Sequence, residues 1–486
     1  DVAGDTFLGM SFSCARCHDH KFDPIHQTDY FQLRAFFEPV IWRDDLVAAT
    51  SAQQEQYREH LAEWEAATSE IRAQMDAIVK PYNDRKWKST VDKFPLEIQA
   101  CFYRDPAERT SWDEQMTYLI SRQFEEEGGG PLKSMKKDDK EKYDALAKQL
   151  EEFADRKPAP LASVMTVTDH AGAVTPTLIP DDINAQSIAP GFPQVLCDSQ
   201  ESPTAELPNL PHSTGRRTAL ADWIGRGDNP LTMRVIVNRI WQQHFGVGIV
   251  GTANDFGHSG EAPTHPLLLD WLTADFVEHG WSLKRLHRQI VLSSTWRQSA
   301  DNGHAAEYQS IDPAERLLWR HRVRRLSAEQ IRDAMLCVSG EMKQQLGGPS
   351  VEENSPRRGL YVKSYRNRID TFLHSFDIAN GLKSVSQRDS TTTPTQSLLL
   401  INGNYALGRA GKMADRLLAM KSGSSTDIVQ QAIRMTWGRD GRPEEVVQCQ
   451  EFLGSVSGED AGPPDKERLA DLCHILLNSS EFLYVR

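Results

Sequence analysis

Cysteine is scarce in this chain, with 7 in 486 residues. A disulfide-stabilised secreted scaffold has a much higher proportion of cysteine, so this composition excludes a disulfide framework. The fold must therefore depend on hydrophobic cores, and a chain of this length is long enough for two or three domains. Cys337 and Cys473 lie in apolar helical runs, which predicts that both are small buried hydrophobic residues.

Long apolar runs are also lacking. No run approaches the roughly 18 residues that a membrane-spanning helix needs, so no membrane span is expected. No signal peptide is recognisable, and the chain starts at Asp1 without a methionine. We expect a fragment or a processed product whose preceding residues are missing, so the lack of a signal peptide does not identify the compartment.

Positive charge is in deficit, because 55 Lys and Arg stand against 68 Asp and Glu, a net charge of -13. Too little basic charge is present to neutralise phosphate groups, which disfavours general binding to nucleic acid or to an anionic membrane. The sequence also has no P-loop, G-x-S-x-G or H-E-x-x-H motif, and no carboxylate spacing that singles out a general acid and base. Whether the chain is an enzyme stays open.

Two of the cysteines belong to a distinctive motif, Cys14-Ala15-Arg16-Cys17-His18. The C-x-x-C-H spacing is typical of c-type haem attachment, in which each thiol adds to one vinyl group of the porphyrin and the imidazole ligates the iron. Given 7 Cys and 15 His, chance predicts only about 0.003 such pentamers in 486 residues. The motif therefore predicts covalent haem c on Cys14 and Cys17, with His18 as an axial ligand of the iron.

Other interpretations of the motif remain open. The two thiols could form a Cys14–Cys17 disulfide, or a redox pair, although a redox pair is expected near a βαβ pattern and none is recognisable. A zinc site would need two further ligands. His20 and His26 could supply them, but the sequence has no second C-x-x-C.

The first 45 residues carry this motif, a helix stop at Phe22-Asp23-Pro24, and an apolar stretch over residues 30–37. Asp29 precedes that stretch and is a candidate N-cap.

A long charged helical hairpin is predicted over residues 46–158. One helix runs from Ser51 to Lys80, where Pro81 is expected to end it. The residues of its seam recur at alternating four- and three-residue steps: Tyr57, Leu61, Trp64, Thr68, Ile71, Met75 and Ile78. A weaker partner seam comprises Tyr143, Leu146, Leu150 and Phe153. We expect the two helices to be antiparallel, with a further helix near Pro106–Phe124 and the glycine linker 128–130 between them.

A proline-rich connector is predicted over residues 159–211. Ser163–Thr168 alternates as a strand does, 169–172 is a turn, and Val174–Ile179 is expected to return as the second strand of a hairpin.

Helices dominate residues 212–486. Helical periodicity, N-caps and glycine or proline stops predict helices at these places: around Leu220–Ile224, Val235–Phe245, Pro266–Glu278, Leu283–Leu292, Ser327–Ser339, Pro394–Ile401, Asp427–Trp437, Pro443–Leu453 and Lys466–Leu477. A short strand is possible at Leu360–Lys363, and Asn402-Gly403 is expected to turn the chain. The fold class is therefore mainly α, with the long antiparallel hairpin and a small β-containing connector.

Several stretches in order carry a family resemblance. They are residues 7–9 with 14–24, the run NRIWQQHFG at 238–246, NDFG at 254–257 with PTHP at 263–266, TTTPTQ at 391–396, and LNSSEFLY at 477–484. Together they resemble the large planctomycete-type cytochrome proteins, in which a cytochrome-like module precedes a planctomycete-specific helical domain of unknown function. The resemblance implies that residues 1–45 are the end of the first module and 212–486 the whole second domain. It also implies a periplasmic or cell-envelope location and a redox association, with no established reaction.

Three functions follow as expectations. The first is a c-type haem protein associated with electron transfer, with redox partner proteins or envelope components as partners; the distal iron ligand is not expected to be Met10, because on a helix it lies on the motif's own side. The second is a haem-free envelope scaffold with zinc or a disulfide at Cys14 and Cys17. The third is an oxidoreductase or carbohydrate-active enzyme whose site lies around His244–His265.

Two local clusters are candidate sites. His244, His258 and His265 surround a glycine-rich loop that also carries Asp255 and Glu261; this pattern is compatible with a metal or acid–base site, and more simply with histidines that satisfy backbone groups. The run Thr391–Thr393 could bind an anion at a helix N-terminus, although capping alone explains it. The sequence does not identify the substrate, the redox potential or the oligomeric state.

Overall fold

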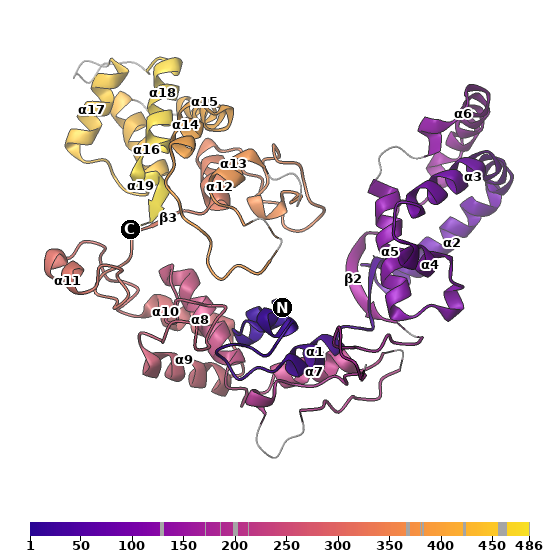
Figure 1. Cartoon of the computed structure of the whole chain (residues 1–486). Coiled ribbons are helices and arrows are strands. Elements are labelled where there is room, and N and C mark those ends of the chain that lie inside the picture. Colours follow the sequence, from indigo (N-terminus) through magenta and orange to yellow (C-terminus); the bar gives the residue numbers. More distant parts are fainter. Residues whose placement is uncertain are drawn as a thin grey trace. The chain divides into compact units, whose positions relative to one another are not determined.

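The computed structural model describes residues 1–126, 131–170, 172–184, 186–197, 203–211, 213–365, 370–379, 381, 383–420, 424–454 and 464–485. The fold is mainly α, as the sequence predicts, and its strands form small two-stranded sheets (Figure 1). The predicted glycine linker 128–130 lies outside the described residues. Within the described residues, no helix is long and apolar enough to cross a bilayer.

The chain divides into two compact units. We call Phe12–Asn229 the hairpin unit, and Asp1–Ser11 together with Pro230–Arg486 the core unit. Each is described by itself.

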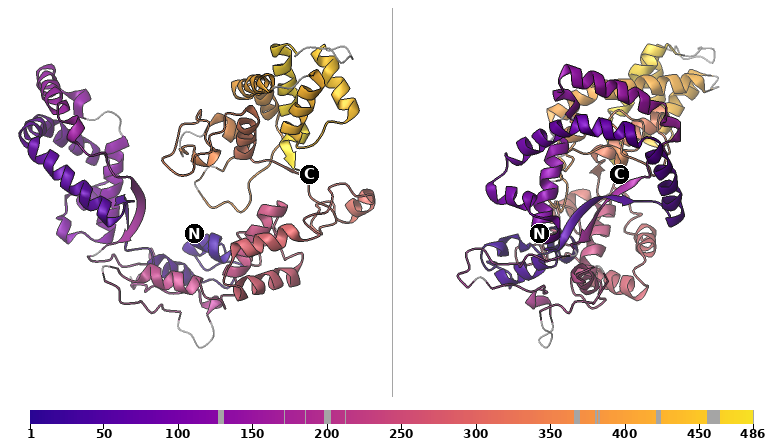
Figure 2. Two further views of the ribbon diagram at one scale, coloured as in Figure 1. Left: turned by 180° about the vertical axis from the view of Figure 1, so that it is seen from behind. Right: turned by 90° about the vertical axis from the view of Figure 1, so that its right-hand side faces the viewer.

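A two-stranded ribbon forms the base of the hairpin unit. Strand β1 (Val40–Val47) pairs antiparallel with β2 (Ser163–Asp169), with Trp42 opposite Val167 (Figures 1 and 2). The expected hairpin between Ser163–Thr168 and Val174–Ile179 is therefore wrong. Residues 174–179 form no strand, because Pro176 has no N–H to donate to a ladder.

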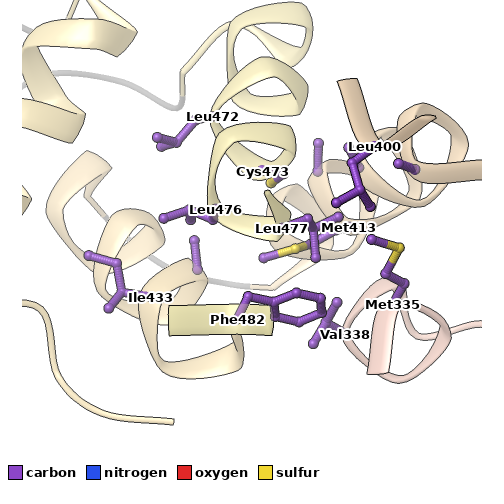
Figure 3. Packing of buried hydrophobic residues seen from close by; sticks show 14 of the residues in the cluster. Met335, Val338, Leu400, Met413, Ile433, Leu472, Cys473, Leu476, Leu477 and Phe482 are labelled. Atoms are coloured by element: carbon purple, nitrogen blue, oxygen red, sulfur yellow. The ribbon is translucent and has the colours of Figure 1, made fainter. Parts of the chain in front are cut away.

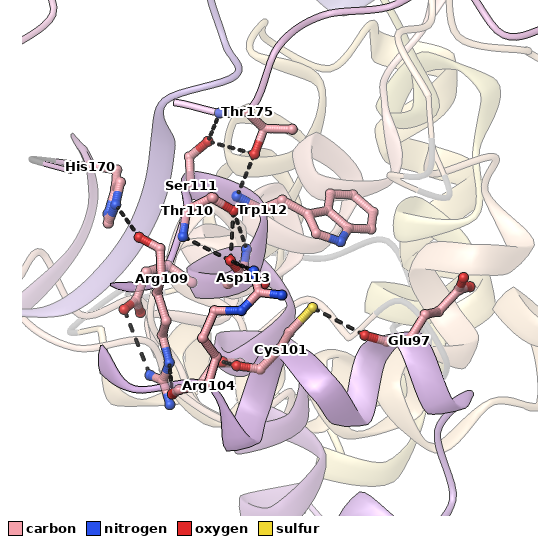
Figure 4. Close-up of polar contacts among 12 residues, drawn as sticks. Glu97, Cys101, Arg104, Arg109, Thr110, Ser111, Trp112, Asp113, His170 and Thr175 are labelled. Atoms are coloured by element: carbon pink, nitrogen blue, oxygen red, sulfur yellow. Dashed lines mark hydrogen bonds and ion pairs between the residues drawn. The ribbon is translucent and has the colours of Figure 1, made fainter. Parts of the chain in front are cut away.

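Residues 170 and 172–175 bind instead to the start of α5 (Ser111–Glu126), as Figure 4 shows. The Ser111 amide donates to the Ala173 carbonyl, and the Trp112 amide donates to Thr175 Oγ1 at 3.2 Å. The His170 ring contacts the Arg109 carbonyl at 2.8 Å. These hydrogen bonds to residues 109–112 hold the segment in place, although it does not pair with a strand.

Buried Asp113 stabilises the same turn. It accepts hydrogen bonds from the Thr110 amide at 2.8 Å and the Thr110 hydroxyl at 2.7 Å, and it pairs with Arg104 at 2.6 Å. Burial alone would raise the pKa of the Asp113 carboxyl, but the Thr110 hydrogen bonds and Arg104 outweigh it and hold that pKa below its usual value.

The predicted helical hairpin is present. Its helices are α2 (Ser51–Ala67), α3 (Ser69–Val91) and α6 (Lys137–Glu151), and all residues of both predicted seams are buried or half-buried. Tyr82 Oη donates to Asp139 at 2.6 Å, and Lys157 lies 4.7 Å above the Trp64 ring. Tyr82 in α3 thus meets the start of α6, whereas Trp64 in the earlier helix α2 meets a residue just beyond the end of α6. The two arms of the hairpin are therefore antiparallel.

The expected end of the first helix at Pro81 is wrong. Pro81 lies inside α3, and the break falls at Thr68, whose hydroxyl donates to the Trp64 carbonyl at 2.8 Å. An interior proline removes one helical hydrogen bond. Packing of the neighbouring Tyr82, which is buried against α6, offsets that loss.

Aromatic stacking joins α3 to its other neighbours, α4 (Leu96–Tyr103) and α5. The Trp87 ring stacks on Phe124 with centroids 3.8 Å apart and on Phe102 at 5.4 Å. The predicted helix near Pro106–Phe124 is thus α5 preceded by a short 3-10 turn at Pro106–Glu108.

Most predicted helices of the core unit are confirmed, several to the residue. They are α8 (Thr232–Phe245), α9 (Pro266–Glu278), α10 (Leu283–Leu292), α12 (Ala328–Ser339), α14 (Pro394–Asn402), α16 (Ser425–Trp437), α17 (Pro443–Leu453) and α18 (Lys466–Leu477). The helix predicted around Leu220 is α7 (Arg216–Ile224) of the hairpin unit. The sequence reading missed α11 (Ala305–Ile311), α13 (Thr371–Ser375), α15 (Asn404–Ala419) and α19 (Ser480–Leu483).

Two local expectations are corrected. Leu360–Lys363 is no strand; residues Gly359–Tyr361 form a 3-10 turn, and Val362 makes a single bridge to Val351. Asp29 is not an N-cap but the third residue of α1 (Gln27–Ala35), where its carboxylate accepts from the amide of the true cap, His26.

Helix α18 lies at the centre of the main core cluster (Figure 3). Leu469, Cys473 and Leu477 are fully buried there, so the expectation for Cys473 is confirmed. Cys337 is exposed, contrary to expectation. On α12 the core-facing residues are Ile331, Met335 and Val338, and Cys337 falls on another face of the helix. Strand β3 (Arg324–Arg325) pairs with β4 (Tyr484–Val485) beside this core.

Candidate functional site

The C-x-x-C-H motif forms a short 3-10 turn, Phe12–Arg16, followed by Cys17 and His18. Phe12 and Ala15 point inward and are 2% and 0% exposed. Cys14, Cys17 and His18 are exposed, and both thiols are free. The turn is therefore anchored by its apolar residues and presents all three predicted haem-attachment residues to solvent.

The ring of His18 is held by its own loop. Nδ1 lies 2.7 Å from the Asp19 carbonyl oxygen. A carbonyl can only accept a hydrogen bond, so Nδ1 is the donor, and in the neutral imidazole Nε2 therefore keeps its lone pair. Metal-ligating histidines are oriented in this way by a carbonyl or carboxylate on the other ring nitrogen.

The Asp19 side chain fixes this loop to the start of α1. Its carboxylate accepts from the Gln27 amide at 2.8 Å and lies 3.4 Å from the His26 ring. The Gln27 hydrogen bond, followed by that of His26, holds the pKa of Asp19 below its usual value. Asp19 is therefore ionised at neutral pH and stabilises the turn that positions His18.

His20 and His26 have structural roles here. His20 Nδ1 accepts from the Asp23 amide at 2.9 Å, and its side chain is 7% exposed. His26 caps α1. In the part of the chain that the structure describes, no group of three or more His, Cys, Asp or Glu side chains is placed to hold a metal ion. The zinc interpretation with these histidines as ligands therefore has no geometric support, and the two thiols form no disulfide.

Met10, the methionine nearest to the motif in sequence, is 7% exposed and buried in the core unit. The donor set of two accessible thiols and one oriented imidazole fits covalent attachment of haem c.

The second predicted cluster, around His244–His265, borders a cavity of about 480 Å³ between the loop 250–263 and helices α8 and α9. His258 and Glu261 line it, and the structure adds Arg234 and Asp270, which pair at 2.7 Å. His244 and His265 have other contacts: His244 Nε2 lies 2.8 Å from His287 Nδ1, and His265 Nδ1 lies 3.0 Å from the Thr264 hydroxyl. Sequence spacing could not reveal Arg234 and Asp270, because they come from different helices.

The cavity loop has a fixed shape. Buried Asn238 donates to the Val250 carbonyl and accepts from the Val250 amide, each at 2.9 Å. Thr252 Oγ1 donates to the Asp255 carbonyl at 2.6 Å and accepts from the Glu261 amide at 2.9 Å. A Cβ at Gly260 would lie 2.0 Å from the Asp255 oxygen, so only glycine fits. Asn238 and Thr252 thus hold the loop in place, and Gly260 lies in the lining of the cavity.

At Thr391–Thr393 the capping interpretation is confirmed. The Thr393 side chain accepts from the Gln396 amide in a capping box at the start of α14. Thr391 Oγ1 donates to Asp377 at 2.8 Å.

Comparison with known families matches two parts of the chain. Residues 216–453 match PSD1, a protein of unknown function (DUF1553), and residues 1–41 match PSCyt2, a protein of unknown function (DUF1549). No curated protein and no solved structure matches the chain. The PSCyt2 segment contains the C-x-x-C-H motif, and the PSD1 segment contains the cavity loop. The chain therefore carries a PSCyt2 segment followed by a PSD1 domain, the two planctomycete-type domains of unknown function that the sequence predicts.

Proposed function

We propose that the chain is a c-type haem protein of the periplasm or cell envelope that takes part in electron transfer, with haem c attached to Cys14 and Cys17 and His18 as an axial ligand of the iron. The observation that carries this proposal is the orientation of the motif. Both thiols are exposed and unpaired, and the Asp19 carbonyl holds His18 Nδ1 at 2.7 Å so that Nε2 is free.

The chain's own residues have distinct tasks in this function. Phe12 and Ala15 anchor the turn, Cys14 and Cys17 supply the thiols for two thioether bonds, and the Asp19 carbonyl keeps the His18 tautomer that ligates through Nε2. When bound, haem supplies a one-electron redox couple. Exposure of the attachment turn would leave that couple accessible to a redox partner protein.

Expression with an export signal and the haem-attachment machinery tests the proposal. We expect a gain of the mass of one haem that survives denaturation, and the α-band of a c-type pyridine haemochrome. The double variant Cys14→Ala/Cys17→Ala should lose both signals. Cys337→Ala is the matched control, since it removes an exposed thiol outside the motif.

His18→Ala separates attachment from ligation. Loss of the imidazole should change the axial ligand field, seen in the visible and magnetic circular dichroism spectra of whatever haem remains attached. A haem-free product with equimolar zinc, or with a Cys14–Cys17 disulfide by thiol titration, would replace this function with that of an envelope scaffold.

The cavity of the core unit supports a second candidate function, an oxidoreductase or carbohydrate-active enzyme. Its lining combines a cation, carboxylates and an imidazole with the apolar surfaces of Phe256 and Leu269. Concave sites of this size with a few convergent polar groups commonly bind small molecules.

Thermal-shift screening of the whole chain with mono- and oligosaccharides tests this second function. A ligand of the cavity should raise the melting temperature of the wild type and not of Gly260→Ala, whose Cβ would collide with the cavity wall. A shift of equal size in both proteins would place the ligand elsewhere.

A further inference from the structure

Three histidines from separate segments gather around Trp296. His244 at the end of α8 and His287 on α10 approach to 2.8 Å between Nε2 and Nδ1. The Trp296 ring meets His244 edge-on with centroids 5.2 Å apart, and it meets His321 in the same way at 5.2 Å. None of these contacts joins neighbours in sequence.

His321, which packs against the same Trp296 ring, has a buried polar atom without a hydrogen-bond partner. It is 7% exposed, and its Nδ1 is buried with no hydrogen-bond partner. A buried polar atom without a partner costs free energy, so native proteins rarely keep one without a reason.

Arg324 supplies a permanent positive charge beside the cluster. It donates one hydrogen bond, to the Gln243 carbonyl at the end of α8 at 2.9 Å. Three other arginines of the same segment have acidic partners: Arg316 pairs with Glu261, Arg320 with Glu315, and Arg325 with Asp377. Among the described residues, Arg324 forms no ion pair with a carboxylate.

The pKa shifts of the histidines are consistent with this excess of basic groups. Burial, then His287 and then Arg324 lower the pKa of His244, and burial followed by Arg324 lowers the pKa of His321. The charged groups that shift the pKa values of these two imidazoles are all basic. This contrasts with the chain as a whole, whose net charge is -13. A local excess of positive charge of this kind attracts an anion.

We infer that His244, His287 and Arg324 form a binding site for a small oxyanion, a carboxylate, phosphate or sulfate group, on the face of the core unit where α8 meets α10. The guanidinium offers a planar pair of donors that matches two oxygens of such a group. Exposed His287 leaves this face open to solvent, and the Trp296 ring packs edge-on against His244.

Binding of the oxyanion should be coupled to protonation of the histidines. In the anion-free protein the two imidazoles share one hydrogen between Nε2 and Nδ1. Protonation of both would place like charges side by side with Arg324, and an anion neutralises that repulsion. The affinity should therefore increase as the pH falls from about 7 to about 5, because burial and the neighbouring positive charges hold the pKa of His244 below the ordinary histidine value.

Isothermal titration of the whole chain with sulfate tests this inference, because the charge of sulfate is constant over that pH range. We expect one site, with affinity about tenfold higher at the lower pH. Arg324→Gln should weaken binding about tenfold or more, and Arg324→Lys should restore part of it. Titrations with acetate and phosphate distinguish a carboxylate site from a phosphate site.

His287→Gln and His304→Gln are the paired variants for the histidine contribution. His287 is exposed, so its replacement should leave the fold intact, as checked by circular dichroism, while it reduces the pH dependence of sulfate binding. His304 is an exposed histidine of the same unit whose carboxylate neighbour is Glu307, and its variant should bind as the wild type does. Absence of binding, equal binding by all variants, or uptake of zinc by His244 and His287 in place of sulfate would overturn the inference.

Discussion

The two helical regions of this protein bury apolar residues in different ways. The hairpin of α2, α3 and α6 has a narrow seam in which most residues are half-buried, for example Leu61, Ile71 and Leu146. The C-terminal core has α18 among α15, α16 and α17, and Leu469, Cys473 and Leu477 lose their solvent contact completely. A helix that is covered by several others, as α18 is, excludes water from a whole face. Residues at the edges of a narrow seam, as in the hairpin, stay partly exposed to solvent.

This difference teaches that regular heptad spacing does not by itself measure stability. The hairpin seam is the most regular pattern in the sequence, yet the weaker apolar pattern of the C-terminal helices produces the larger buried core. We expect the free energy of unfolding to depend more on the second region than on the first.

The largest effect is expected from Leu469→Ala in α18. The leucine is fully buried, so its truncation should cost about 4 kcal/mol in the free energy of unfolding, measured by denaturant titration with circular dichroism. Leu146→Ala in α6 is the matched control, and since Leu146 is half-buried it should cost about 1 kcal/mol. Equal costs would remove the distinction between the two regions.

Ile71→Asp in α3 should have the next largest effect. The change places a carboxylate in the seam against apolar partners and should cost about 2 kcal/mol in the transition of the hairpin unit. Ala73→Asp introduces the same charge on an exposed position of the same helix and should cost only about 0.5 kcal/mol. If both variants unfold as the wild type does, the seam is not packed in solution.

A smaller, pH-dependent effect is expected from Glu445→Gln. Arg439 binds both oxygens of Glu445 at 2.8 Å, also pairs with Glu481, and lowers the pKa of Glu445 to about 2. A lowered pKa means that the stabilisation is complete above the ordinary value of 4.5 and is lost as the pH falls toward 2. After allowance for solvent screening, we expect a loss of about 1 kcal/mol at neutral pH.

Urea titrations of the Glu445→Gln variant and the wild type between neutral and acid pH measure this effect. The two stability curves should converge in acid. Glu444→Gln removes the neighbouring exposed carboxylate and should follow the wild type throughout. A constant difference at every pH would assign the loss to packing and not to charge.

The smallest change expected is a gain, from Pro81→Ala in α3. Alanine restores the amide that the helix lacks at this position, so the hairpin unit should become more stable by about 1 kcal/mol, seen as a higher melting temperature. Pro95→Ala is the control, because Pro95 caps α4 from outside the helix and its replacement should change little. A loss of stability at position 81 would mean that the proline ring itself packs in the hairpin.

Much of the helical architecture could be predicted from the sequence, because the signals that start and stop a helix are local. Pro266 begins α9, Ser282 caps α10, and Gly340 ends α12 in the left-handed conformation that glycine adopts without strain. Helix α15 was missed for an equally local reason. Its core face is mostly small, with Ala406, Ala410 and Ala414, and glycines interrupt the pattern.

The candidate sites likewise differ in whether their residues are close together in the sequence. The C-x-x-C-H motif is contained in five consecutive residues, so the motif could be recognised without a structure, and the structure adds the hydrogen bond that orients His18. The cavity and the cluster around Trp296 were not predictable as sites. Arg234 and Asp270, or His244 and His287, become neighbours only when separate helices pack.

The sequence by itself determined where most helices begin and end and where the C-x-x-C-H motif lies, because backbone capping, periodicity and the motif each act within a few residues. Only the tertiary structure decided that β2 pairs with β1 across the helical insertion, that Pro81 is tolerated inside α3, and that Cys337 is exposed. Strand partners, packing that offsets a lost hydrogen bond, and the side of a helix that faces a core all depend on residues far apart in the chain.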